Sequence, residues 1–357
     1  MHAHRAPRPG RRPSAAWFAV VLTVVAALAA TGISVTATAS SAKAKAKVHR
    51  SVRHHGHLNP HVKRVHHGLA GASSPTARTA AKGSTTGICG SLTGRPARIS
   101  HVIWIVLENR SYSQVMRAPY ISALAAQCGV ETNYHNISHP SLPNYIAMTS
   151  GRAMGQLPTT DCPAFCPVSG PSIFTQTTSW HVYAESMPGR CVRHDALPYV
   201  VHHTAAPYYS SVTNCATNDV PLTALNMSAL PRFSMIVPNV ANDMHEGSSS
   251  VAAGDSWLRS HLGAIFSSAT YRAGGTVVFV TWDEGGTPRT TKNCALNTSD
   301  QGCHVALLIA SPHIAPRSRW SMLANHYSLL QATEHLLGLP YLGMGASAPS
   351  IRTAFRL

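Results

Sequence analysis

The stretch Thr276-Val-Val-Phe-Val-Thr-Trp-Asp-Glu-Gly-Gly286 joins a short apolar run to two consecutive acids. A run of this length, rich in β-branched residues, predicts a strand that is buried on both faces, as in a parallel sheet. The strand is expected to cover 276–281 and to leave Asp283 and Glu284 at its carboxyl end. Three other apolar runs repeat this design: 101–107, which ends at Glu108 and Asn109, 233–237, which Asp243 and His245 follow, and 305–310, which ends at Ser311.

Segments of helical character separate these runs, at 120–127, 252–267 and 327–337. Strands that alternate with helices predict an α/β fold around a mostly parallel sheet. In open sheets of this kind, ligands bind at the carboxyl ends of the strands. Acids that are far apart in the chain are therefore expected to meet at one site.

The chain has only 13 acids, and five of them follow apolar runs directly. A carboxylate is ordinarily solvated, but two adjacent acids at the end of a buried strand repel each other unless a cation lies between them. The pair Asp283–Glu284 therefore predicts metal ligation. Oxygen ligands without a nearby cysteine favour a hard or borderline divalent ion.

The chain of 357 residues has a formal net charge of +16, which taken alone points to nucleic-acid binding. The charge is unevenly distributed, because residues 1–100 contain 15 of the 29 Lys and Arg residues and no acid. The remaining 29 − 15 = 14 basic residues stand against all 13 acids, which leaves a net charge of +1. Specific nucleic-acid binding is therefore not predicted, and any binding by the basic segment would be unspecific and salt-sensitive.

Residues 1–39 combine four arginines, an apolar run at 15–30 and the small-residue site Ala37-Thr-Ala39. This order of segments predicts a cleaved secretory signal peptide. The alternative is an uncleaved N-terminal anchor, because the apolar run just reaches the length of a membrane span when 31–35 are added. The protein is expected to be secreted, or to be retained at the outer face of the membrane by that uncleaved segment.

Residues 40–98 are rich in His, Lys and Ala and have no apolar period. We expect a disordered basic tether that contacts an anionic cell surface, with metal scavenging by its histidines as the alternative. The remainder, 99–357, is expected to be a single catalytic domain. The sequence predicts no oligomeric state.

All eight cysteines lie after residue 88. An even number of cysteines in an exported chain predicts disulfide bonds. Cys162 and Cys166 also have the spacing of a metal knuckle, but no histidine lies near them. Neighbours in sequence such as Cys191 with Cys215 and Cys294 with Cys303 are natural pairs, among many other connectivities.

The segment His139-Pro-Ser-Leu-Pro-Asn-Tyr145 begins an apolar, helix-like run that reaches Gly151. Ser141 is expected at the N-cap of this helix, with proline in the first turn. Its hydroxyl then faces free backbone N–H groups, a position that also suits a phosphate. Capping alone is the ordinary explanation, but the metal-ligand pattern elsewhere in the chain favours a nucleophile.

Taken together, these segments resemble the phosphoesterase family of secreted bacterial acid phosphatases and phospholipases C, within the alkaline-phosphatase-like superfamily. The resemblance implies a three-layer sandwich in a single domain with disulfides, and its short form is most similar to secreted mycobacterial acid phosphatases that act on phosphatidylinositol 3-phosphate. The segments that carry it run in the family's order: Glu108-Asn-Arg-Ser-Tyr112, His139-Pro-Ser-Leu-Pro-Asn-Tyr145, Tyr183-Ala-Glu-Ser-Met-Pro188, Arg193-His-Asp195, Pro238-Asn-Val-Ala-Asn-Asp-Met-His-Glu-Gly247, Thr281-Trp-Asp-Glu-Gly285 and Asn325-His-Tyr-Ser328.

The resemblance also implies a role for each matching residue. Ser141 is the implied nucleophile, and His194 and His245 are the implied phosphate-contacting histidines, one of them a proton donor. The chain reads Arg193-His-Asp-Ala196 where the family usually reads His-Asn-Pro, so His194 departs from the pattern. The implied ligands of one divalent metal ion are Glu108, Asn109, Asp283 and Glu284, and further contacts to the substrate are expected from His139, Asn144, Asp243, His304 and His326.

These roles imply a secreted, metal-dependent acid phosphatase that hydrolyses phosphate monoesters, phosphoinositides among them, through a phosphoserine at Ser141. The substrate is then a small phosphate ester or a lipid. One alternative is a phosphodiesterase or phospholipase C that acts on lipid headgroups, because the same centre serves both reactions. A more distant alternative is a surface protein that binds metal or phosphate without catalysis.

Overall fold

The computed structural model describes residues 87–357, except 163–164, 248, 288, 290 and 298. The predicted signal segment 1–39 and residues 40–86 of the predicted tether lie outside the described residues. The predicted domain boundary at residue 99 is too late. Cys89 is 3 % exposed and bonded to Cys128, and the Leu92 N–H donates to the Pro312 carbonyl at 3.0 Å, so these residues belong to the domain.

A nine-stranded sheet forms the centre of the domain, in the order β4-β3-β5-β1-β6-β7-β2-β8, with β9 paired to β2. All four predicted strands are present within one or two residues of their expected bounds. Their apolar side chains are almost completely buried, which explains the lack of alternation in the sequence. The strands are β1 (His101–Leu107), β2 (Gly129–His135), β3 (Trp180–Ala184), β4 (Asp219–Pro221), β5 (Phe233–Val237), β6 (Thr276–Trp282), β7 (His304–Ala310), β8 (Arg319–Trp320) and β9 (Ala324–Asn325).

One of the predicted strands runs against the others. β1 pairs in parallel with both β5 and β6, whereas β7 is antiparallel to β6 and to β2. Ser311 was expected to lie beside the residues that follow the other three strands. This expectation is wrong, because the end of β7 lies at the opposite edge of the sheet. The first residue of β7, His304, lies at the edge where β1 and β6 end.

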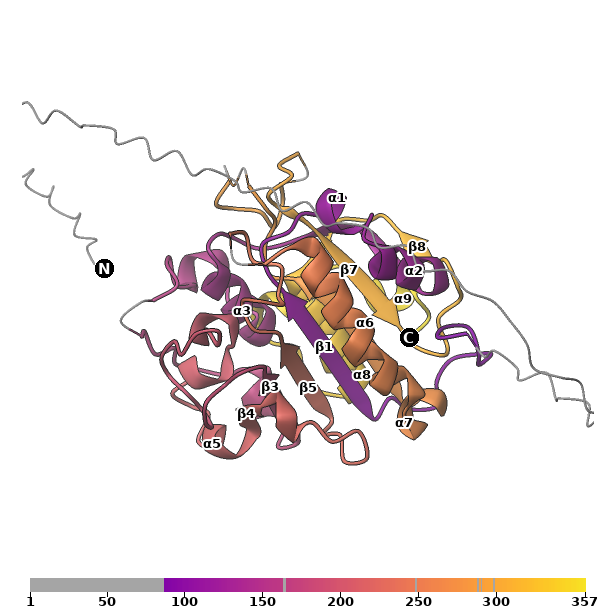
Figure 1. Cartoon of the computed structure of the whole chain (residues 1–357), viewed down its shortest axis with the longest axis horizontal. Coiled ribbons are helices and arrows are strands. Elements are labelled where there is room, and N and C mark those ends of the chain that lie inside the picture. Colours follow the sequence, from indigo (N-terminus) through magenta and orange to yellow (C-terminus); the bar gives the residue numbers. More distant parts are fainter. Residues whose placement is uncertain (1–86, 163–164, 248, 288, 290, 298) are drawn as a thin grey trace, which may run out of the picture. The chain divides into compact units, whose positions relative to one another are not determined.

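Helices cover both faces of the sheet, and Figure 1 shows α6 in front of it and α8 behind it. The predicted three-layer α/β sandwich is confirmed. Among the described residues, no helix is long and apolar enough to span a membrane. The helices are α1 (Tyr112–Val115), α2 (Pro119–Gln127), α3 (Ser141–Ser150), α4 (Ile173–Gln176), α5 (Cys215–Asn218), α6 (Val251–Ser267), α7 (Ala269–Arg272), α8 (His326–Leu337) and α9 (Ile351–Ala354), with five short 3₁₀ helices between them.

Four disulfide bonds join all eight cysteines, and they include both pairs that were expected from sequence neighbourhood. Cys162 and Cys166 form a bond with each other, so the metal-knuckle alternative is wrong. The bonds are Cys89–Cys128, Cys162–Cys166, Cys191–Cys215 and Cys294–Cys303.

Candidate active site

The carboxyl ends of β1 and β6 bring the four predicted metal ligands together. These strands pair in register from His101 to Leu107, so the residues that follow them are neighbours. The Asn109 N–H donates to Asp283 Oδ1 at 3.1 Å, across the junction of the two strands. Glu108, Asn109, Asp283 and Glu284 are all buried, with at most 1 % of their surface exposed.

Burial strongly affects the acids of this group. It raises the pKa of Glu108 well above its ordinary value, and the charge of Asp283 adds to the effect. The pKa of Asp283 is raised in the same way, first by burial and then by Glu284. Asp283 Oδ2 is buried and has no hydrogen-bond partner among the described residues. Buried carboxylate and amide oxygens with one acceptor unsatisfied fit a hard divalent cation.

Ser141 lies directly beside this group. Its hydroxyl donates to Glu108 Oε2 at 3.1 Å, and the Asn109 side-chain amide donates to Ser141 Oγ at 3.4 Å. Ser141 is the first residue of α3 and not its N-cap, as was expected, because Pro140 occupies that position. The first-turn N–H of Leu142 is capped by Asp161 Oδ1 at 2.9 Å. The serine hydroxyl is therefore directed at the acids instead of capping its helix.

Asn144 holds the loop that leads to Ser141. Its side-chain oxygen accepts hydrogen bonds from the N–H groups of Ile137 and Ser138, at 2.9 and 3.0 Å. Its side-chain N–H₂ donates to the carbonyls of Ser138 and Pro140, at 2.9 and 3.0 Å. All its hydrogen-bonding capacity is thus used by backbone groups. We assign Asn144 to the support of Ser141 instead of the predicted substrate contact.

His203 is a site residue that the sequence analysis missed. It is 2 % exposed and lies between two acids, with Nε2 3.5 Å from Glu108 Oε2 and Nδ1 3.3 Å from Asp243 Oδ2. Burial lowers its pKa well below the ordinary value and raises that of Asp243 to about 6. The predicted residue Asp243 therefore lies directly beside His203, and its contact with substrate stays a prediction.

His245 lies in the same group of residues, and its predicted contact with phosphate stays a prediction. Its N–H donates to Asp243 Oδ1 at 2.7 Å, and its ring stacks on that of His203 with 5.6 Å between centroids. Side-chain atoms of Glu108, His203 and His245 come within 4.8 Å of one another. The imidazoles of His203 and His245 therefore lie near Glu108, the acid that accepts the hydrogen bond from Ser141.

His194, by contrast, is exposed, and no hydrogen bond or ion pair between described residues joins it to the site. The structure does not bring it to the other predicted residues, and its contact with phosphate stays a prediction. The signal that could have identified His203 is the pair of histidines after the apolar run Tyr199-Val-Val201. His203-Thr-Ala205 departs from His-Asn-Pro no more than the segment at His194, nine residues earlier.

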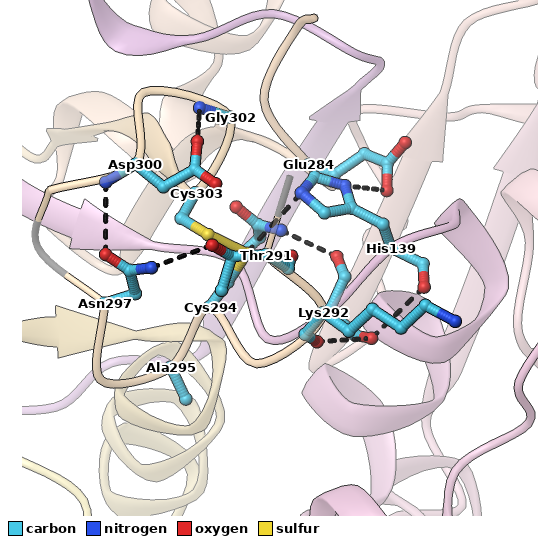
Figure 2. The surroundings of a disulfide bond; sticks show 12 residues. His139, Glu284, Thr291, Lys292, Cys294, Ala295, Asn297, Asp300, Gly302 and Cys303 are labelled. Atoms are coloured by element: carbon cyan, nitrogen blue, oxygen red, sulfur yellow. Dashed lines mark hydrogen bonds and ion pairs between the residues drawn. A yellow bond between two sulfur atoms is a disulfide. The ribbon is translucent and has the colours of Figure 1, made fainter. Parts of the chain in front are cut away.

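His139 connects the acids to a disulfide bond, as Figure 2 shows. Its Nδ1 lies 2.7 Å from Glu284 Oε2, and its Nε2 lies 3.5 Å from the Sγ of Cys294. The bond from Cys294 to Cys303 closes the loop that follows Glu284. His139 is thus a neighbour of the predicted ligand Glu284, and the disulfide fixes the loop on its other side.

Two further groups, one cationic and one hydroxyl, contact the acids, and neither was predicted from the sequence. Arg289 donates to Asn109 Oδ1 at 2.8 Å and contacts Glu284 through the same nitrogen. The Tyr145 hydroxyl donates to Glu108 Oε1 at 2.6 Å. Tyr145 could have been found, since it is four residues after Ser141 on one helix, whereas Arg289 lies in a loop without a pattern.

The two remaining histidines of the sequence analysis have supporting positions. His326 Nε2 lies 2.6 Å from the Asp283 carbonyl, and burial lowers its pKa to about 4. His304 Nε2 lies 3.0 Å from the Thr132 carbonyl, and its ring stacks on Tyr112. Both histidines therefore contact backbone carbonyls at the edge of the sheet, and His304 also contacts an aromatic ring.

Comparisons with known proteins identify the family of the chain. Residues 114–340 match the model of the Phosphoesterase family. A phosphatidylinositol-3-phosphatase of Mycobacterium tuberculosis is 31 % identical over 268 residues, which cover 71 % of this chain and 81 % of that protein. An acid phosphatase of Aspergillus fumigatus is 26 % identical over 258 residues, which cover 68 % of this chain and 55 % of that protein. The chain thus spans about half the length of this fungal relative.

Two solved structures are also similar to this chain. One from Bacteroides thetaiotaomicron, from work on the metabolism of multiple glycosaminoglycans, aligns with a TM-score of 0.50 at 11 % identity, over 73 % of this chain and 82 % of that chain. A Vibrio parahaemolyticus protein in the alkaline phosphatase superfamily aligns with a TM-score of 0.47 at 13 % identity, over 74 % and 72 %. At this identity the likeness concerns the fold alone. The family match and the mycobacterial relative carry the assignment: the chain belongs to the phosphoesterase family and is a phosphoric ester hydrolase.

Proposed function

We propose that the protein is a metal-dependent phosphomonoesterase that works through a phosphoserine at Ser141. The observation that carries the proposal is the hydrogen bond from the Ser141 hydroxyl to Glu108, at 3.1 Å, in the first turn of a helix. A nucleophile needs a proton acceptor and a place for the charge of the phosphate. Glu108 supplies the first, and the amino end of α3 contributes to the second.

The residues that would hold one divalent ion are Glu108, Asn109, Asp283 and Glu284. The unsatisfied Oδ2 of Asp283 and the raised pKa values of Glu108 and Asp283 support this choice. When bound, such an ion supplies Lewis-acid polarisation of the phosphate and of the serine hydroxyl. This donor set suits several hard or borderline divalent ions.

The chain's own residues then carry the proton transfers. Ser141 Oγ gives its proton to Glu108 as the new oxygen–phosphorus bond forms, and the bond from phosphorus to the leaving alcohol breaks. His245 gives a proton to that alcohol; the family resemblance implies this role for one of His194 and His245, and of the two only His245 lies beside Glu108. His203, whose Nδ1 faces Asp243 and whose Nε2 faces Glu108, takes a proton from the water that attacks the phosphoserine. The bond from phosphorus to Ser141 Oγ then breaks, and Oγ takes its proton back from Glu108. Asp243 keeps the imidazole of His203 in this orientation.

The names of the relatives favour phosphate monoesters over diesters. One of the two is called an acid phosphatase and the other a phosphatidylinositol-3-phosphatase, and neither name denotes a diesterase. We therefore propose a monoester substrate, with phosphoinositides included. Rates on p-nitrophenyl phosphate and bis-p-nitrophenyl phosphate separate this proposal from the phospholipase C alternative, which requires the diester to react faster.

We further propose that the enzyme acts outside the cytoplasm. The support is the use of all eight cysteines in disulfide bonds, which persist in oxidising compartments. Whether the leader is cleaved is a separate question. The amino-terminal sequence of the protein, taken from medium and from membranes, distinguishes secretion from retention by an uncleaved segment.

The test of the catalytic proposal is Ser141→Ala, assayed on p-nitrophenyl phosphate. We expect turnover to fall by at least about a thousandfold, because the covalent route is lost, while the fold survives. Ser150→Ala is the matched control, since Ser150 is a buried serine at the other end of the same helix that donates to the Ile146 carbonyl. Chelation should silence the wild type, and a divalent ion should restore it. A Ser141→Ala variant with wild-type rates would refute the nucleophile, and an active metal-free enzyme would refute the metal.

A further inference from the structure

The two most exposed large apolar side chains of the described residues lie on loops at the catalytic edge. Leu197 is 77 % exposed and Leu296 is 76 % exposed. Leu197 lies in the connection that leaves the carboxyl end of β3, and Leu296 lies in the one that leaves the carboxyl end of β6. β6 is parallel to β1, and β3 is parallel to β5, which is itself parallel to β1. Both loops therefore leave the sheet at the edge that carries Glu108.

The first loop holds Leu197 at the tip of a tight turn. The backbones of Ala196 and Tyr199 exchange two hydrogen bonds of 3.0 Å, with Leu197 between them. The Val240 N–H donates to the Pro198 carbonyl at 3.1 Å, and the bond from Cys191 to Cys215 anchors the start of the loop. The leucine is therefore presented to solvent by a fixed backbone.

The second loop has the same construction. Leu296 lies between Cys294 and Cys303, which are bonded to each other and completely buried. The Asn297 N–H donates to the Cys294 carbonyl at 3.1 Å, which closes a turn around Leu296. Single exposed leucines are common on protein surfaces, but here two rigid tips on separate loops flank one active site.

Each leucine is accompanied by an exposed basic residue, Arg193 on the first loop and Lys292 on the second. Neither Arg193 nor Lys292 forms an ion pair with a described residue. Arg193 lies over the ring of Phe165, 5.7 Å from its centre. A leucine beside an unpaired cation is the combination that enters the boundary between acyl chains and anionic headgroups.

We propose that Leu197 and Leu296, with Arg193 and Lys292, dock the catalytic edge on an anionic lipid bilayer. The inference rests on the proposed function and gives its substrate class: a phosphomonoester lipid that is hydrolysed while it remains in the membrane. The fixed loops lower the entropic cost of docking, because they need not be ordered on contact. The docked edge also brings Ser141 to the level at which the phosphorylated headgroups lie.

The binding test uses the full chain and the double variant Leu197→Ser/Leu296→Ser. Both carry the same basic N-terminal segment, so any difference between them reports the two loops. Co-sedimentation is measured with phosphatidylcholine vesicles and with vesicles that also contain phosphatidylglycerol. We expect the wild type to prefer the anionic vesicles, and the variant to partition about a hundredfold more weakly, about tenfold for each leucine removed from acyl chains. Arg193→Gln/Lys292→Gln should reduce the preference for phosphatidylglycerol and its sensitivity to salt.

The matched control is Met344→Ser, which removes an apolar side chain that is 41 % exposed at the far end of α3. Its N–H donates to the carbonyl of Gly151, the residue that ends this helix, about 15 Å along the axis from Ser141. This variant should bind vesicles as the wild type does. Equal losses in Met344→Ser and in the leucine double variant would overturn the docking surface.

Activity separates the two proposals. The leucine double variant should hydrolyse p-nitrophenyl phosphate at the wild-type rate, but phosphatidylinositol phosphate in vesicles about tenfold or more slowly. A wild type that is inactive on p-nitrophenyl phosphate would refute the proposed function. An active wild type whose vesicle binding does not change with the leucines would refute the docking surface alone. A dimer in solution that becomes monomeric in the double variant, without any change in vesicle binding, would show that a second copy of the chain covers the leucines, and it would also overturn the inference.

Discussion

His203 is the residue whose role in this site is most open to a direct test. Its imidazole lies between Glu108 and Asp243, and burial lowers its pKa well below the ordinary value, which favours the neutral ring. A neutral imidazole with one nitrogen fixed by a carboxylate is a general base. The adjacent His202 instead faces Asp195, at 4.0 Å, and is partly exposed.

We therefore expect His203→Gln to reduce kcat on p-nitrophenyl phosphate by about a hundredfold or more, as the loss of a general base usually does. Because the base acts on the second step, the phosphoserine should accumulate and be visible as a mass increase on the peptide with Ser141. His202→Gln should retain its activity. Equal losses in both variants, without accumulation of phosphoserine, would contradict the role of His203.

The sequence alone identified those site residues that directly follow a strand of the sheet. Glu108 and Asp283 could be predicted as neighbours because parallel strands end at one edge. His203 and Arg289 could not, because His203 ends a three-residue 3₁₀ helix and Arg289 lies in a loop, and tertiary contacts decide the path of both segments. His194 was selected by its similarity to a family segment, and the segment at His203 matched no worse.

Among the elements, α2 depends on a single buried acid of α6. Asp255 is 4 % exposed, and its two oxygens accept from the N–H groups of Tyr120 and Ile121, at 3.0 and 2.9 Å. These are the first-turn donors of α2, whose own N-cap, Ala118, has no side-chain acceptor. The hydrogen bonds therefore cap α2 and also fasten it to α6.

Asp255→Ala should lower the free energy of unfolding by about 1–3 kcal/mol, because it leaves two donors of a helix end without a partner. Urea unfolding of the oxidised protein measures the change. Ser256→Ala is the control, since Ser256 is exposed on the same helix and its replacement should change stability by less than about 0.5 kcal/mol. Equal midpoints for Asp255→Ala and the wild type would refute the capping role.

The elements also show which parts of the fold an apolar pattern can predict. The strands β1, β5, β6 and β7 were recognisable because each is a continuous apolar run. The direction of β7 was not, since burial on both faces requires the same residues in a parallel and in an antiparallel strand. The short edge strands β4, β8 and β9 have too few residues for any period to be read.

For the molecule as a whole, the net charge of +16 describes mainly the first hundred residues, and the rest is nearly neutral. Several of the few acids in the domain are buried. We expect the burial of these acids to control how the free energy of unfolding changes with pH. Burial raises the pKa of Glu131 to about 7 and that of Glu334 to about 8. Glu334 is the better probe, because it lies outside the candidate site, on α8, where it accepts from the Leu342 N–H at 2.9 Å.

The sign of the effect follows from the direction of the shift. The folded state holds the proton of Glu334 up to about pH 8, whereas the unfolded chain releases it near the ordinary value of 4.5. The stabilising contribution of the protonated carboxyl is therefore complete below pH 4.5 and is lost as the pH rises from there to about 8. Glu334→Gln keeps the acceptor for Leu342 and cannot ionise. We expect this variant to be more stable than the wild type at pH 8 and similar to it at pH 5, by urea unfolding at both values. Because Glu131 titrates equally in both proteins, the difference between them isolates Glu334, and a difference that does not change with pH would contradict the prediction.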